Sequence, residues 1–290
     1  MDTTDIVVRS AIRLAEKVKA SAIVVSGDIR FDGITTSIPI YFASVKSKSV
    51  IDNLVSSGID KERQAKEFSA MISRETTTKI EHVENTAAIE QMLGQLKSGI
   101  VVGIDVTKDS SAIVIHDLSD NPLVRTMQEC EERVPPDVMR AVLTIAFDVA
   151  TTGREGKQVG NAFIVGDEDE VMKRSHQIIL NPYAGHAKED RDILNKQNWE
   201  SIKEFAQLDG VFIVSEEGII ESAGRYLDVD AKDIALDKGL GGRHVSAAAI
   251  TRDTVAIAVT VSESGGIIRI FMDGKENMCI ESAERAVRRQ

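Results

Sequence analysis

A glycine-rich segment followed by two side chains that can carry positive charge is the first place where the sequence could do chemistry. Residues 238–242 have the sequence KGLGG and lead into Arg243 and His244, where a run of alanines then indicates the start of a helix. We expect Gly241 and Gly242 to adopt positive φ and so direct backbone N–H groups at one anion. The helix N-terminus would add unpaired N–H groups and the positive end of its dipole. The alternative is a flexible glycine turn before an ordinary helix, because the segment matches neither the Walker A nor the G-x-G-x-x-G pattern.

Two carboxylates stand at the ends of expected strands. Asp209 precedes the apolar run 211–214, with Gly210 beside it permitting a close ligand, and Glu263 follows the run 255–261. Acids in such places can hold Mg²⁺ or Mn²⁺ and orient a hydroxyl nucleophile, although Asp-Gly is also a common turn. Oxygen ligands for a hard cation beside phosphate donors are the components that phosphoryl or nucleotidyl transfer requires.

Other chemically capable residues do not form a pattern. The four remaining histidines show no metal-ligand spacing with one another or with Cys130 and Cys279, and no Cys-x-x-Cys or G-x-S-x-G motif is present. We therefore expect structural or surface roles for them. The acidic run 167–170 is expected to form a solvated face, and Trp199 is expected to pack in the interior.

Composition excludes several classes of protein. The chain has 290 residues, of which 42% are hydrophobic and 28% charged, values typical of globular domains. No apolar stretch approaches the roughly 20 residues that cross a bilayer, and no signal peptide is evident, so we expect no membrane segment. Two cysteines cannot build a disulfide framework, which favours a cytoplasmic protein. A net charge of −11 argues against nucleic acid as a general partner, but a local group of cations can still bind a small phosphorylated ligand.

Helix and strand patterns alternate along the first third of the chain. This alternation predicts a parallel sheet with covering helices, and Asp5 is a candidate N-cap for the first helix. The expected helices are 7–18, 50–55 and 62–72, and the expected strands are 22–25, 38–42, 100–104 and 112–115.

A polar, proline-containing segment, residues 119–136, is the expected connection between two domains, residues 1–124 and 125–290. Beyond it the pattern changes to a mixed sheet with hairpins, so the fold class is α/β throughout. The expected elements there are a helix at 138–149 ending near Gly153, a strand at 160–165, a hairpin of 211–214 with 219–224, a helix beginning after Gly242, and a hairpin of 255–261 with 267–272.

Four segments in this order resemble the diadenylate cyclase (DAC) domain family, which is marked by Asp-Gly-Ala and Arg-His-Arg motifs. The segments are residues 208–211, 223–227, 239–248 and 261–265. The first third, over residues 11–25 and 38–42, is similar to the C-terminal domain of pyruvate kinase. Together the two resemblances point to the archaeal type, in which a pyruvate-kinase-like α/β domain precedes a mixed-sheet DAC domain.

The resemblance implies the condensation of two ATP to cyclic di-AMP (c-di-AMP) with release of two pyrophosphates. Each ATP is attacked by the 3′-OH of the other, so two sites must face each other in a homo-oligomer and a lone subunit should be inactive. The implied catalytic residues are Asp209, Arg243 and His244, and the implied ligands of Mg²⁺ or Mn²⁺ are Asp209 and Glu263. The implied substrate-binding residues are Gly210, Tyr226, Leu227, Gly241, Gly242, Arg243, His244, Ser246 and Ser262, with Tyr226 and Leu227 shaping the adenine pocket.

The chain departs from the family pattern at four positions. Val211 replaces the alanine of Asp-Gly-Ala, Val245 replaces the second arginine of Arg-His-Arg, Gly242 replaces a common threonine, and Ser246 replaces an alanine. The loss of one cation puts the affinity for the triphosphate in doubt. The alternative function is therefore a catalytically degenerate sensor that binds ATP or c-di-AMP. A third hypothesis, an assembly or DNA-associated protein, is opposed by the acidic charge balance.

Overall fold

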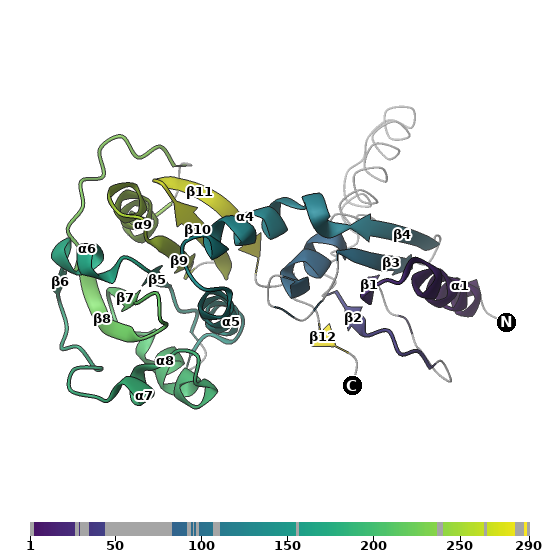
Figure 1. Ribbon diagram of the computed structural model, residues 1–290, viewed down its shortest axis with the longest axis horizontal. Helices are drawn as coiled ribbons and strands as arrows, with labels where there is room; N and C mark the ends of the chain where they lie inside the picture. The colour runs from purple at the N-terminus through teal and green to yellow at the C-terminus, as the bar shows by residue number, and fades with distance from the viewer. Residues whose placement is uncertain are drawn as a thin grey trace, which may run out of the picture. The chain divides into compact units, whose positions relative to one another are not determined.

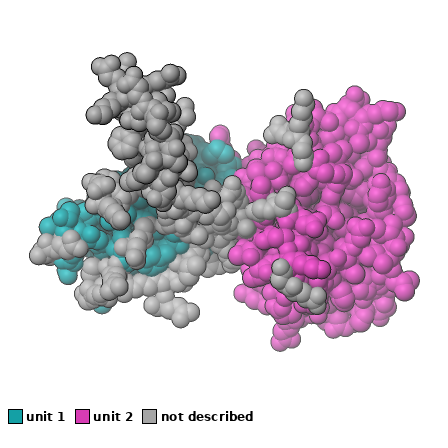
Figure 2. All heavy atoms as spheres, turned by 180° about the vertical axis from the view of Figure 1, so that it is seen from behind, with its two compact units in different colours: residues 1–124, 283–290 teal, residues 125–282 magenta. Residues whose placement is uncertain are grey.

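The structure is a computed structural model that describes residues 3–26, 29, 35–43, 83–91, 94, 96, 99–106, 111–154, 157–236, 240–263, 266–281 and 287–288. The chain divides into two compact units, residues 1–124 with 283–290 and residues 125–282 (Figure 2). The expectation that 125–290 forms one domain is corrected at its end. Strand β12 (Val287–Arg288) pairs with β2 (Ile40–Phe42) in the sheet of the first unit. The helices expected at 50–55 and 62–72 lie outside the described residues.

The first unit contains a five-stranded sheet in the order β12-β2-β1-β3-β4. Its further elements are α1 (Thr3–Val18), β1 (Ala22–Ser26), β3 (Ile100–Val106) and β4 (Ser111–Asp117). Strand β1 pairs in parallel with β2 and β3, but β4 and β12 pair antiparallel, so the sheet is mixed rather than parallel. All of β1 is buried, because α1 packs on one face and the helical residues 83–91 on the other.

One local expectation in this part of the chain is wrong. Asp5 lies inside α1 and accepts a hydrogen bond from Arg9 at 2.9 Å, so it is not the N-cap. The expected connection 119–136 contains the division between the two units, after residue 124, and its helices are η1 (Leu118–Asp120) and α4 (Pro122–Glu131). The side chain of Asn121 accepts the N–H of Leu123 at 2.9 Å, which satisfies a free donor at the start of α4, and proline is favoured at a first helical position.

The second unit contains a seven-stranded sheet in the order β11-β10-β9-β5-β7-β8-β6. Its strands are β5 (Asn161–Val165), β6 (Ser175–Gln177), β7 (Val211–Val214), β8 (Ile220–Leu227), β9 (Ile257–Val261), β10 (Ile267–Met272) and β11 (Lys275–Glu281). Only β5 and β7 pair in parallel. Both expected hairpins, β7–β8 and β9–β10, are confirmed.

Helices cover both faces of this sheet (Figure 1). Helix α5 (Pro136–Thr152) buries the expected apolar stripe and ends at Gly153, where φ is 57°. Helix α9 (Gly242–Asp253) packs on the opposite face, where the small side chains of residues 247–249 are fully buried and allow a close approach to the strands. The remaining elements are α6 (Glu168–Lys173), α7 (Lys188–Arg191), η2 (Lys196–Asn198) and α8 (Trp199–Phe205). Within the described part of the chain, no helix combines the length and apolar character needed to cross a membrane.

Candidate functional site

One edge of the second sheet carries a cavity of about 1030 Å³. This volume lies at the upper end of the range for small-molecule sites. The residues that line it are Ile178, Asp209, Gly210, Val211, Arg225, Tyr226, Leu227, Leu240, Gly241, Gly242, Arg243, His244, Ser246, Val261, Ser262, Glu263, Ile267 and Arg269. All eleven predicted site residues are among them. The structure therefore brings the predicted residues together, while the roles assigned to them stay predictions.

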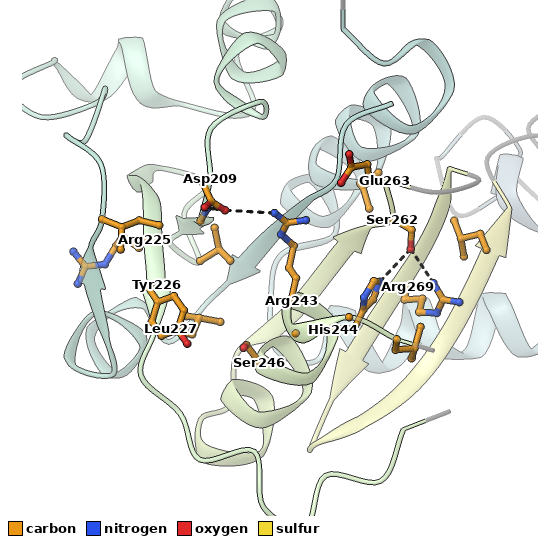
Figure 3. A pocket seen from close by; sticks show the side chains of 18 residues that line it. Asp209, Arg225, Tyr226, Leu227, Arg243, His244, Ser246, Ser262, Glu263 and Arg269 are labelled. Carbon is orange, nitrogen blue, oxygen red and sulfur yellow. Dashed lines mark hydrogen bonds and ion pairs between the residues drawn. The ribbon is translucent and has the colours of Figure 1, made fainter. Parts of the chain in front are cut away.

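The strand directions explain why these residues meet. Strands β5 and β7 run in parallel, and β9 runs antiparallel to β5 with Asn161 opposite Val261. The start of β5, the start of β7 and the end of β9 therefore lie at the same edge of the sheet. The end of β8 joins them, since Val211 pairs with Arg225. Helix α9 begins at the same edge, and its N-terminus enters the cavity (Figure 3).

The backbone beside Asp209 adopts a conformation that requires glycine at position 210. Gly210 has φ of 102°, and a Cβ there would lie 2.6 Å from the carbonyl carbon of Gly224 and 2.7 Å from the nitrogen of Arg225. The N–H of Gly210 donates to Asp209 Oδ1 at 3.0 Å. The Asp209 side chain is nevertheless 84% exposed. The loop thus holds a solvated carboxylate in a defined place at the cavity.

The prediction of positive φ at Gly241 and Gly242, at the start of α9, is wrong. Gly241 has φ of −75° and ψ of 171°, and Gly242 is already helical, so neither has a positive φ. A Cβ on either glycine would meet no atom within 4 Å, so these residues border open space. No side chain caps α9. Its first N–H groups therefore remain available to an anion, by helix geometry rather than by a glycine turn.

His244 shares Ser262 with an arginine that sequence reasoning missed. His244 Nε2 lies 3.1 Å from Ser262 Oγ, and Arg269 Nη1 donates to the same oxygen at 3.0 Å (Figure 3). Burial lowers the pKa of His244, Arg269 and Arg243 lower it further, and the Gly241 carbonyl partly opposes them. At neutral pH the imidazole is therefore neutral, and its Nε2 can accept the hydroxyl hydrogen of Ser262.

Arg243 lies between the two predicted metal ligands (Figure 3). Its Nη2 is 3.8 Å from Asp209 Oδ1. A Cβ on Gly160 would lie 2.9 Å from Arg243 Nη1 and 3.1 Å from Glu263 Cβ, so the absence of a side chain at Gly160 makes room for both. Gly160 was not predicted as a site residue. Its only sequence signal is a glycine directly before a buried strand, which can mark a close approach.

The described residues contain no group of three or more His, Cys, Asp or Glu side chains placed to hold a metal. Asp209 and Glu263 nonetheless both line the cavity. Magnesium is usually held by one or two carboxylates together with substrate phosphates, so two carboxylates beside an anion site fit such an ion. Carboxylate oxygens suit Mg²⁺ and Mn²⁺ alike, and do not distinguish them.

The cavity wall formed by β8 is less polar. Tyr226 is 54% exposed, and its ring centroid lies 5.4 Å from that of His176. Leu227 is buried beneath it. The guanidinium of Arg225 points away from Arg243 (Figure 3). It donates to Ser175 and to the carbonyl of Met172. An aromatic face beside an aliphatic side chain suits a planar ring.

Comparison with known families assigns the two parts of the chain separately. Residues 148–276 match the family DAC, described as "DisA bacterial checkpoint controller nucleotide-binding". Residues 6–119 match the family DacZ_A, described as "Probable sensor domain DacZ_A". The expected similarity to pyruvate kinase is not supported, since the match in that part of the chain is to a different family.

Two curated relatives carry the name diadenylate cyclase. The protein from Methanocaldococcus jannaschii is 38% identical over 179 residues, which cover 62% of this chain and 54% of the relative. The protein from Haloferax volcanii is 42% identical over 144 residues, which cover 49% of this chain and 52% of the relative. The matched part of the chain thus spans about half the length of each relative.

Solved structures give weaker similarities. A hypothetical membrane spanning protein from Bacillus cereus is 18% identical, with a TM-score of 0.36 over 47% of this chain and 59% of that one. A double mutant of DacA from Staphylococcus aureus is 20% identical, with a TM-score of 0.34 over 49% of this chain and 86% of that one.

Proposed function

We propose that residues 125–282 form a diadenylate cyclase that condenses two ATP into c-di-AMP and two pyrophosphates. The observation that carries this proposal is that the cavity lies in the part of the chain that matches the DAC family. Every residue that lines the cavity lies within the segment 148–276 that matches the DAC family, and the cavity combines an anion site with two carboxylates. The names of the two relatives support the same reaction.

The triphosphate would bind at the N-terminus of α9. The uncapped N–H groups there attract anions, Arg243 adds side-chain donors, and His244 would donate through Nδ1, since its Nε2 accepts from Ser262. Arg243 would leave its position 3.8 Å from Asp209 and turn to the α-phosphate, where negative charge grows in the transition state. Tyr226 and Leu227 would hold the adenine on the opposite wall.

Asp209 would orient the 3′-OH of ATP and, with Glu263, hold a divalent cation. Bound there, the cation would lower the pKa of the attacking hydroxyl and offset charge on the phosphates. In each half-reaction one 3′-O–P bond forms, one bond between the α-phosphorus and the bridging oxygen breaks, pyrophosphate leaves, and the hydroxyl proton is lost. Two such steps close the ring.

The reaction requires a second copy of the chain. Each cavity would hold one ATP, and each ATP supplies the nucleophile for the other, so two cavities must face one another. Holding both nucleotides in this geometry converts a bimolecular step into an effectively unimolecular one, which is worth up to about 7–11 kcal/mol of the barrier. Homo-oligomerisation is therefore part of the proposed function.

We further infer that the first unit regulates the second. The description of the matching family as a probable sensor domain supports this inference. A pyruvate-kinase-like fold for this unit stays a prediction. A regulatory role predicts that the residues 125–282 alone would lose a response to an effector, whereas the chemistry would remain in the second unit.

The test is mass-spectrometric detection of c-di-AMP, with pyrophosphate release, from the purified full chain, ATP and either Mg²⁺ or Mn²⁺. Asp209→Ala is run beside it, with Asp190→Asn, an exposed acid outside the cavity, as the control. Product from the wild type and from the control, but none from Asp209→Ala, would support the cyclase. Tight ATP binding without product under either metal would replace it with the sensor.

A further inference from the structure

Arg269 is a cation in the wall of the cavity to which no role has been assigned. It lies in the middle of β10, between Ile268 and Ile270, whose side chains are fully buried. Neighbouring side chains of a strand point to opposite faces, so Arg269 alone of these three faces the cavity that it lines. Its side chain is only 13% exposed. A buried guanidinium is costly unless it is paired, so the question is what holds this one.

Two partners fix the orientation of this guanidinium. Glu276 on β11 lies behind it, with its Oε2 3.1 Å from Arg269 Nε, and Glu276 is not among the residues that line the cavity. On the cavity side, Arg269 Nη1 donates to Ser262 Oγ at 3.0 Å. The planar fork of an arginine held at two points is preorganised for bidentate contact with phosphate oxygens.

The position of Arg269 along the cavity indicates which part of a nucleotide it would meet. Figure 3 shows Tyr226 and Leu227 on one side of Arg243 and Arg269 on the other, beyond His244. An ATP with its adenine at Tyr226 and its α-phosphate at Arg243 would extend its remaining phosphates towards Arg269.

We propose that Arg269 binds the terminal phosphates of ATP and holds the pyrophosphate as it leaves. This inference rests on the proposed function for the identity of the nucleotide. Arg269 is thereby a substrate-binding residue whose counterion, Glu276, keeps it in place from outside the cavity. The proposal separates the two ends of the substrate: loss of Arg269 should affect ligands with terminal phosphates and spare those without.

The test is calorimetric titration of the full chain with α,β-methylene-ATP, pyrophosphate and AMP. The methylene bridge cannot be cleaved, so binding is measured without turnover. Arg269→Met should weaken binding of the ATP analogue and of pyrophosphate about tenfold or more, because a hydrogen-bonded charge is lost. AMP binding should stay within about twofold of the wild type, since AMP lacks the phosphates concerned. Arg269→Lys, which keeps the charge without the fork, should recover part of the loss.

Controls separate this role from a structural one. Arg133→Met removes an arginine that pairs with Asp273 outside the cavity and should change neither affinity. Glu276→Gln removes the counterion but leaves the cation in the cavity. If Arg269 serves only to join β10 to β11, both Arg269→Met and Glu276→Gln would lower the melting temperature while binding of the ATP analogue stayed unchanged, and the proposal would be overturned. An equal loss for AMP would overturn it too.

Failure of this inference and failure of the proposed function give different results. If the wild type binds the ATP analogue but makes no c-di-AMP, the proposed cyclase function is excluded. The ratio of ATP-analogue to AMP affinity in Arg269→Met then still decides the role of Arg269. A wild type that makes c-di-AMP, with Arg269→Met binding the analogue normally, removes only the role of Arg269. A wild type that binds neither the analogue nor pyrophosphate removes both.

Discussion

Asp209 and Arg269 line the same cavity, yet their surroundings are opposite. The Asp209 side chain is 84% exposed; it accepts the N–H of Gly210 and lies 3.8 Å from Arg243. The Arg269 side chain is 13% exposed and is held by Ser262 at 3.0 Å and by Glu276 at 3.1 Å. One wall of the cavity is solvated, and the other is hydrogen-bonded before any ligand arrives.

The difference indicates how the work of the site is divided. A wall whose donors are already oriented does not reorganise when charge develops beside it, which is what stabilises a transition state. A solvated carboxylate, in contrast, gains its partners only with the ligand. We therefore expect the wall of His244, Ser262 and Arg269 to govern binding of phosphate, and Asp209 to govern the rate of attack.

The largest expected effect comes from Asp209→Asn. The variant keeps the shape of the side chain but cannot orient and activate the hydroxyl as a carboxylate does, so turnover should fall about 10²- to 10⁴-fold. In the absence of a divalent cation, affinity for α,β-methylene-ATP should change little, because the phosphates would then contact α9 and the other wall. Initial rates of c-di-AMP formation and calorimetry measure the two quantities. A parallel fall in affinity and rate would show that the division between the walls is wrong.

Gly210→Ala tests whether the loop that carries Asp209 on the exposed wall is rigid. Gly210 has φ of 102°, and its Cβ would lie 2.6 Å from backbone, so the substitution should lower the free energy of unfolding by at least about 1–3 kcal/mol. Gly242→Ala is the matched control, since its Cβ meets nothing within 4 Å and alanine favours a helix by about 1 kcal/mol over glycine. Urea unfolding monitored by circular dichroism compares them. Equal stability of the two variants would mean that the Asp209 loop shifts to accommodate the added Cβ and is not rigid.

These two glycines also show where sequence reasoning reached its limit. The glycine-rich run before α9 was expected to have positive φ, but Gly241 and Gly242 do not, whereas Gly210 and Gly224 at the Asp209 loop and on β8 do. The reason is tertiary: β8 passes against the Asp209 loop, and no local pattern records that approach. The resemblance of the ordered motifs to the DAC family, in contrast, pointed to eleven residues that all line the cavity.

Arg269 and Gly160 could not be predicted in the same way. Arg269 acquires its meaning from Ser262 on the neighbouring segment and from Glu276 on β11, and Gly160 from its closeness to Arg243. Both relationships join segments that are distant in the sequence. The sequence does contain one indication of Arg269, because it interrupts the apolar run 267–271. A charge in a buried strand requires a partner. For the connection 119–136 no helix was predicted, although Asn121 accepts the N–H of Leu123 at the start of α4.

Ser262→Ala tests the preorganised wall with a smaller change. His244 and Arg269 would each lose their shared partner, and affinity for pyrophosphate should fall roughly tenfold, the value expected for a lost hydrogen bond to a charged group. Ser262→Thr retains the hydroxyl and should stay near the wild type. Titration with pyrophosphate is the measurement. Full affinity in Ser262→Ala would mean that His244 and Arg269 are held well enough without it.

The smallest expected effect is a dependence of stability on pH. Burial and the two arginines lower the pKa of His244 below its ordinary value of 6.5, so the unfolded chain takes up a proton that the folded chain does not. The contribution of His244 to stability is therefore complete above about pH 6.5 and decreases as the pH falls towards the lowered pKa. His244→Gln should remove this part of the slope.

Thermal melts of the wild type and His244→Gln between pH 7.5 and pH 5.5 measure the difference between the two slopes. Burial also lowers the pKa of His116 in the first unit, so the comparison must be between variants rather than on the wild type alone. Identical slopes would show that His244 is as easily protonated as a solvated histidine, and that the wall beside it is not closed to water.

The pairing of β12 with β2 has a consequence for the order in which the molecule forms. Strand β2 receives its second neighbour from residues 287–288, which the ribosome adds after the whole of the second unit. The first sheet is therefore the first to be synthesised and the last to be completed. Until then, this side of β2 has no neighbouring strand in the sheet, and other chains can add to an edge of that kind. The longer residues 125–282 take to fold, the longer this edge of β2 stays without β12.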